Sequence, residues 1–173
     1  MKCLLLFCLS WFSCSLLAAE VRLAGTTLSF VAPDEFEPFS QAIIAAKWPA
    51  RRAPRWVVGN ASTSTSIAYD IKQNDISTAP LHVVMNSLKN TMQRIGPGLQ
   101  WVKTEVVDIH GKAWVYLEFT SQAINADVHN IMLVSAYDKQ MIIFNFNSTK
   151  EEFAQYEDQL RESVQSIKMD GLS

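Results

Sequence analysis

Alternation of apolar and polar residues is the main pattern along this chain, and it predicts a protein rich in β-strands. A period of two, with many β-branched and aromatic residues, is typical of half-buried strands. The turns His110-Gly111 and Asp138-Lys139 are short enough for hairpins, although the second lacks the glycine that such turns favour. Seven segments show the alternation, at residues 27–31, 55–59, 64–71, 100–109, 112–121, 128–137 and 140–147. The last four predict an antiparallel meander.

A spacing of three and four residues replaces this alternation in two places, and it predicts two amphipathic helices. Ser77 or Thr78 is a candidate N-cap for the first helix, and Gly96-Pro97-Gly98 is a stop signal. Thr149 and Glu152 form a capping box for the second helix. The apolar stripes consist of Leu81, Val84, Met85, Leu88, Met92 and Ile95 in the first helix, and of Phe153, Tyr156, Leu160, Val164 and Ile167 in the second.

A third, short helix is expected between Ser40, which can cap it, and Pro49, which ends it. Strands combined with three helices predict an α+β fold in which helices cover an antiparallel β-sheet. Because the chain has no repeat, low-complexity tract or linker, we expect one domain over residues 20–173. Trp101 and Trp114 fall on neighbouring predicted strands, and we expect both to be core residues that pack against each other.

The first nineteen residues have the composition of a secretory signal peptide. Lys2 is followed by an apolar run over residues 4–17, and the small residues Ala18-Ala19 form a candidate cleavage site before Glu20. The run is shorter than the roughly 20 apolar residues of a membrane-spanning helix, and no later segment is long enough. We therefore expect an exported protein, periplasmic or secreted, without a transmembrane segment in the mature chain.

Cleavage of this leader would remove all three cysteines, Cys3, Cys8 and Cys14, so the mature domain is expected to contain no disulfide. Cys14 also offers an alternative. Together with the preceding Phe12-Ser13 it loosely resembles the lipidation site of a bacterial lipoprotein, although Trp11 stands where leucine is usual. In that alternative the mature protein is tethered to a membrane by a lipid on Cys14.

The composition and motifs of the mature chain disfavour nucleic-acid binding and catalysis. Loss of Lys2 from the fifteen basic residues leaves the seventeen acidic residues in excess by three, so nucleic acid is not an expected partner. His82, His110 and His129 do not have the spacing of a metal site, so no metal is expected. Because nucleophile motifs and phosphate-binding glycine loops are also missing, we expect no catalytic residues and no cofactor.

The segment 47–56 is the strongest candidate for a binding surface. Four basic side chains are concentrated there on an otherwise acidic chain, and two tryptophans frame them. Arginine beside tryptophan binds anions and partner carboxylates, and both are enriched at the energetic centres of interfaces. The alternative is a solvated loop whose tryptophans are anchored in the core and whose arginines pair locally. This segment, the basic loop, contains Lys47, Trp48, Arg51, Arg52, Arg55 and Trp56.

Four landmarks, in their order along the chain, resemble the PsbP-like superfamily, especially bacterial DcrB-type exported proteins. They are LSFVAP at 28–33, KWP with RRAP at 47–54, IHGKAW at 109–114, and FNFN at 144–147 leading into Phe153 and Ser166-Ile167. The resemblance implies an α/β/α sandwich. Its known members include a photosystem accessory subunit, a yeast Ran-binding protein, type VI secretion effector chaperones and envelope proteins of unknown role, so it implies binding more than catalysis. The export leader distinguishes this chain from the cytoplasmic chaperones.

Three functional hypotheses follow. The leading one is a non-catalytic accessory or protein-binding protein of the periplasm, with a protein partner still to be identified. The second is an envelope inhibitor or immunity protein that neutralises a secreted toxin, for example a type VI secretion effector. The third is a hydrolase with an unrecognised site, which a pocket joining His129 to two carboxylates would support.

Overall fold

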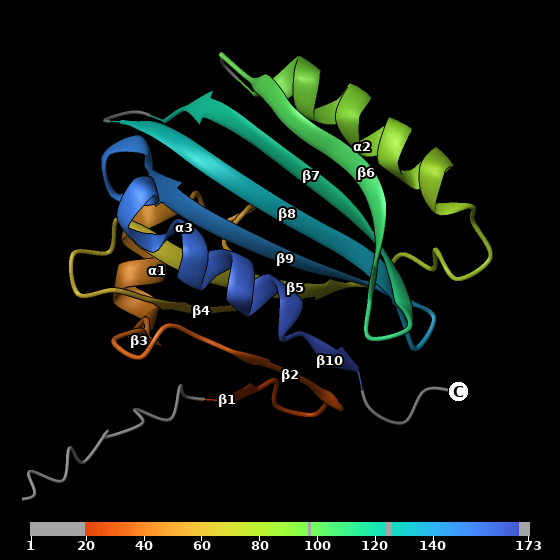
Figure 1. Cartoon of the computed structure of the whole chain (residues 1–173), viewed down its shortest axis with the longest axis horizontal. Helices are drawn as coiled ribbons and strands as arrows, with labels where there is room; N and C mark the ends of the chain where they lie inside the picture. Colours follow the sequence, from red (N-terminus) through yellow and green to blue (C-terminus); the bar gives the residue numbers. More distant parts are fainter. Residues whose placement is uncertain (1–19, 97, 124–125, 170–173) are drawn as a thin grey trace, which may run out of the picture.

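The computed structural model describes residues 20–96, 98–123 and 126–169, so the predicted leader with Cys14 lies outside the described residues. The main element is a seven-stranded antiparallel sheet in the order β3-β4-β5-β9-β8-β7-β6 (Figure 1). Its strands are β3 (Glu37–Pro38), β4 (Trp56–Gly59), β5 (Thr65–Lys72), β6 (Gln100–Ile109), β7 (Lys112–Gln122), β8 (Asp127–Tyr137) and β9 (Gln140–Thr149). The six strands predicted from residue 55 onward are confirmed, each end within two residues.

A smaller three-stranded antiparallel sheet joins the two ends of the described chain. Its order is β1-β2-β10, with β1 at Glu20–Arg22, β2 at Leu28–Val31 and β10 at Lys168–Met169. Strand β2 is the strand predicted at 27–31, whereas β1 and β10 were not predicted. Because β10 follows the last helix directly, this sheet fixes the end of that helix against the beginning of the domain.

The three predicted helices are present as α1 (Gln41–Lys47), α2 (Leu81–Ile95) and α3 (Lys150–Gln165). The Ser40 and Thr149 side chains accept hydrogen bonds from the backbone N–H groups of Ile43 and Glu152, so both predicted caps are confirmed. The cap expected at Ser77 or Thr78 is wrong. Helix α2 begins after Pro80 without a side-chain cap.

The reason for the missing cap lies just before α2. Ser77 uses both its hydroxyl and its backbone N–H to bind Oδ1 of Asp75, at 2.6 and 2.9 Å. Its side chain is therefore engaged in a local turn three residues before Pro80, whose fixed φ suits the start of a helix.

Helices cover both faces of the large sheet, which confirms the α/β/α sandwich. Helix α3 and the small sheet pack on one face, which we call the α3 face. Helix α2 packs over β6 and β7 on the opposite face, and α1 packs on that same face over β4 and β5. None of the helices in the described ranges combines the length and apolar character needed to cross a membrane.

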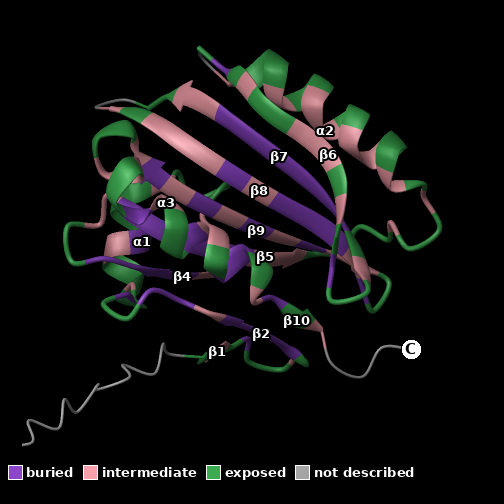
Figure 2. Ribbon diagram, viewed as in Figure 1, coloured by how far each residue is buried: buried purple, intermediate pink, exposed green. Residues whose placement is uncertain are grey.

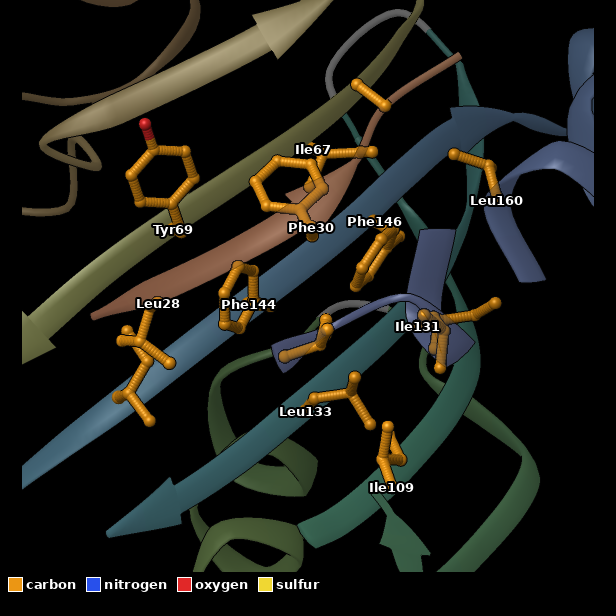
Figure 3. Packing of buried hydrophobic residues seen from close by; sticks show 14 of the residues in the cluster. Leu28, Phe30, Ile67, Tyr69, Ile109, Ile131, Leu133, Phe144, Phe146 and Leu160 are labelled. Atoms are coloured by element: carbon orange, nitrogen blue, oxygen red, sulfur yellow. The ribbon is translucent and has the colours of Figure 1, made fainter. Parts of the chain in front are cut away.

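The principal core lies between the sheet and α3, and it is built from the inward-pointing residues of the central strands (Figures 2 and 3). Phe30 on β2 packs edge-on against Phe144 on β9, with ring centroids 5.6 Å apart, and Leu160 on α3 is completely buried in the same core. A fully buried side chain of this size contributes about 1.5–3 kcal/mol. The apolar stripe predicted for α3 is therefore the stripe that closes this core.

The predicted contact between Trp101 and Trp114 is wrong, because the two rings lie on opposite faces of the sheet. A β-bulge inserts Val102 between Trp101 and Lys103 and reverses the alternation of β6 at that point. Trp101 therefore packs, partly buried, against Phe119 on the face that α2 covers, whereas Trp114 is fully buried on the α3 face.

Both predicted two-residue hairpin turns are present. His110 and Gly111 have φ values of 52° and 80°, and Asp138 and Lys139 have φ values of 45° and 56°. Two positive φ angles are the signature of the type I′ turn, whose twist matches that of the flanking strands. Asp138-Lys139 adopts this turn without a glycine.

Candidate functional site

The basic loop connects α1 to β4, at the edge of the large sheet. Trp48 caps α1 at its C-terminus and packs with Ile44 and Val57 on the α1 side. Trp56 is the first residue of β4, and its ring stacks on Tyr69 of the α3 face, with a centroid separation of 5.4 Å. The two tryptophans are thus anchored on opposite faces of the sheet, and they frame the loop without approaching each other.

Two of the four cations of the basic loop lie over aromatic rings. The Lys47 Nζ is 5.6 Å from the ring centroid of Trp48 and donates a hydrogen bond to the Thr63 carbonyl. Partial burial lowers the pKa of Lys47. The Arg55 guanidinium lies 4.4 Å from the ring of Trp56. Such cation–π pairs contribute about 0.5–1 kcal/mol at exposed sites, and they fix the direction of each cation.

The other two cations, Arg51 and Arg52, lie in an exposed turn. The turn is closed by a 2.8 Å hydrogen bond from the Arg52 backbone N–H to the Pro49 carbonyl. Neither guanidinium has a salt bridge or hydrogen bond to another group in the part of the chain that is described. Each can therefore accept a carboxylate from outside the molecule without first breaking an internal pair.

A second polar cluster lies on the α3 face, and the sequence analysis missed it. Glu118 on β7 is only 2% exposed. Its carboxylate accepts hydrogen bonds from Arg161 on α3 at 2.9 Å, from the Tyr116 hydroxyl at 2.8 Å and from Nε2 of His129 at 2.7 Å. Arg161 also donates to Glu157, one turn earlier on α3, at 2.7 Å. We call these five residues the Glu118 cluster.

The Glu118 cluster keeps a buried charge ionised. Burial raises the pKa of Glu118, but the hydrogen bonds from Arg161, Tyr116 and His129 outweigh it and lower the pKa overall. Burial and the hydrogen bond to Glu118 raise the pKa of Tyr116, so the phenol stays protonated and donates. Hydrogen bonds to Glu118 raise the pKa of Arg161. The cluster therefore joins α3 to the sheet through a buried ion pair.

The same geometry bears on the hydrolase hypothesis. Both oxygens of Glu118 already accept hydrogen bonds, and the His129 ring is stacked on Phe153 with ring centroids 3.6 Å apart. Among the described residues, Glu118 is the only carboxylate hydrogen-bonded to His129, and Glu157 reaches the cluster only through Arg161. The structure therefore does not bring His129 together with two carboxylates in a pocket. Residues 20–96, 98–123 and 126–169 also contain no group of three side chains able to hold a metal.

The fold is shared with known protein structures, although no sequence relative is found. No family model matches the sequence, and no curated protein matches it significantly. Among solved structures, cyanobacterial PsbP (CyanoP) from Synechocystis matches with a TM-score of 0.60 at 10% identity, over 87% of this chain and 91% of that one. The chain has a PsbP-like fold. The resemblance seen in the landmarks is thus confirmed at the level of the fold.

Two further structures share this PsbP-like fold. The Ran-binding protein Mog1p from Saccharomyces cerevisiae matches with a TM-score of 0.57 at 15% identity, over 88% of this chain and 95% of that one. PA94 from Pseudomonas aeruginosa, a protein of unknown function, matches with a TM-score of 0.56 at 18% identity, over 90% of this chain and 99% of that one. The fold is therefore shared by proteins with diverse or unknown roles.

Proposed function

We propose that this protein is a non-catalytic, exported protein of the DcrB type that binds a protein partner through the basic loop. The observation that carries this proposal is the exposed Arg51–Arg52 turn, which has no internal carboxylate partner among the described residues. The chemistry of two adjacent guanidinium groups indicates a partner surface that carries aspartate or glutamate side chains.

The surroundings of the turn support this role. Arg55 over Trp56 and Lys47 over Trp48 hold two more cations at the two ends of the loop, so the positive charge is spread over one edge of the sheet. Trp56 is stacked on the buried Tyr69, which connects the loop rigidly to the core. A rigid support reduces the ordering cost of binding, and it favours a defined partner over diffuse charge attraction.

Affinity capture from envelope extracts, with the protein as bait, tests the proposal. The variant R51A/R52A/R55A should lose the partner while its melting temperature stays within about 2 °C of the wild type, because exposed cations contribute little to stability. The matched control is R22A/K150A/K168A, which removes the same charge from exposed positions elsewhere. This control should retain the partner.

Each result of the capture has a defined meaning. Retention of every partner by R51A/R52A/R55A would remove the basic loop from the proposal, and equal losses in both triple variants would indicate bulk charge attraction. Recovery of a secreted toxin as the partner would identify the protein as the inhibitor of the second hypothesis. If a strain that lacks this protein survives exposure to that toxin, the inhibitor hypothesis is excluded.

A further inference from the structure

The two edges of the large sheet differ in length and in exposure. One edge ends in the two-residue strand β3, whereas the other ends in the ten-residue strand β6. Among the described strands β6 pairs only with β7, so its outer side has no partner in that part of the chain. A long exposed edge presents free backbone N–H and C=O groups, which is a template for pairing with another strand.

Large apolar side chains are exposed on this edge strand and on the helix that packs over it. All four large apolar residues that are exposed in the described part of the chain lie on β6 or on the adjacent helix α2. Val102 and Val106 on β6 are 57% and 42% exposed, and Val83 and Ile95 on α2 are 52% and 56% exposed. Exposed apolar residues that lie together on one surface mark an interaction site, whereas isolated ones do not, and Val102 and Val106 lie on the same strand. The edge strand therefore has both the backbone and the side chains of an interface.

The sequence of β6 suits pairing with a second copy of the same strand. Lys103 and Glu105 lie on either side of Thr104, and they pair with each other at 2.6 Å within the chain. In an antiparallel pairing of two β6 strands about Thr104, each Lys103 lies opposite the other copy's Glu105. The same register places Val102 opposite Val106, so the two exposed valines cover each other. The strand is complementary to itself in charge and in apolar character.

We infer that the β6 edge binds a second copy of this chain, through an antiparallel pairing of residues 102–106 centred on Thr104. The bulge at Val102 ends the regular pairing at that residue, as bulges commonly do on edge strands. The two sheets then become continuous across a two-fold axis. The basic loop lies at the opposite, β4 edge, so dimer formation leaves it free and gives the dimer two such loops.

Charge reversal tests the register. The protein, expressed with its leader and purified, should sediment as a dimer in analytical ultracentrifugation at concentrations up to about 1 mM. Either single variant, K103E or E105K, places like charges opposite each other and should raise the dissociation constant at least about tenfold. An equimolar mixture of K103E and E105K should form a heterodimer, because every cross-strand pair is then opposite in charge.

The mixture separates the interface from the fold of each chain. Each single variant also loses its own Lys103–Glu105 pair, which mixing cannot restore, so recovery in the mixture reports only contacts between chains. A wild type that stays monomeric, a dimer that survives both reversals, or a mixture that stays monomeric would each overturn the inference. Purification of the wild type as a complex with a different protein and without self-association would also overturn it.

Discussion

The guanidinium of Arg161 lies across the carboxylate of Glu118, with Nη2 2.9 Å from Oε1 and Nη1 3.3 Å from Oε2. The Glu118 side chain is 3% exposed and that of Arg161 is 41% exposed. The pair therefore joins a buried anion on β7 to a cation on α3 that reaches it from the surface. It is the main polar contact between α3 and the β7 end of the sheet. The packing of α3 on β7 is therefore stabilised by the ionised form of Glu118.

Removing the cation should destabilise the fold. We expect R161M to lower the free energy of unfolding by about 2–3 kcal/mol, because Glu118 is left buried without its strongest donor. The partial exposure of Arg161 keeps the loss below that of a fully buried pair. The control K150M breaks the exposed pair with Asp127 and should cost less than about 0.5 kcal/mol. Urea denaturation measures the free energy of unfolding of both variants. Equal losses in R161M and K150M would contradict a stabilising role for the Arg161–Glu118 pair.

The Glu118 cluster also predicts a dependence of stability on pH. The pKa of Glu118 is lowered in the folded state, so its contribution is complete above the unfolded pKa of about 4.3 and is lost as the pH falls below it. E118Q should therefore be less stable at pH 7 and should lose less stability than the wild type on acidification towards pH ~3. Glu152, whose pKa is also lowered, accounts for part of the remaining loss. If the free energy of unfolding of E118Q and of the wild type falls equally with pH, this role of Glu118 is excluded.

The turn between β8 and β9 offers a stabilising substitution. Lys139 has a φ of 56°, a conformation that glycine adopts without steric cost. We expect K139G to stabilise the protein by about 0.5–1 kcal/mol, measured as a higher denaturant midpoint. In the equivalent turn between β6 and β7, G111A at φ 80° should destabilise it by a similar amount. The same sign for both substitutions would show that backbone conformation does not control these turns.

Gly59 at the end of β4 should not tolerate a side chain. A Cβ at this position would lie 2.5 Å from the Phe39 ring and 2.6 Å from the Thr65 carbonyl oxygen. The ring can move, but the backbone oxygen is held in the β4–β5 hairpin. We expect G59A to cost about 1–3 kcal/mol in thermal or chemical unfolding. If G59A instead leaves the stability unchanged, the hairpin shifts freely, and β4 does not support the basic loop rigidly.

The predicted leader can be tested by fractionation. If the signal peptide is cleaved before Glu20, N-terminal sequencing of the exported protein should begin at Glu20, and the protein should be released with the soluble envelope fraction. C14S should then leave this distribution unchanged. If C14S instead converts a membrane-bound protein into a released one, the lipid tether at Cys14 is correct and free release is wrong.

Local signals along the chain were sufficient for most of the elements, because the physics that forms them is local. Thr149 and Glu152 are three residues apart and specify the start of α3, and the alternation of the central strands fixes which residues face the core. Positions that depend on register were harder. A single extra residue, Val102, turns Trp101 to the opposite face, and nothing in the apolar pattern marks a bulge there.

The Glu118 cluster was missed for the same reason, although the sequence contains a signal for it. Trp114, Tyr116 and Glu118 occupy the same face of one strand, so a carboxylate at the third of these positions must be buried and must find a cation. The cation comes from Arg161 on α3, and only the packing of α3 on the sheet shows which basic residue it is. The basic loop could be proposed as a candidate because its residues are adjacent in the sequence.

The pairing of β2 with β10 ties Ser29 to Lys168, which are almost the two ends of the described chain. The small sheet can therefore close only after the chain from Ser29 to Lys168 has left the ribosome. Until then the apolar face of β2, with Leu28 and Phe30, has only part of its cover. Covering of this face by β10 therefore follows the synthesis of every other described strand.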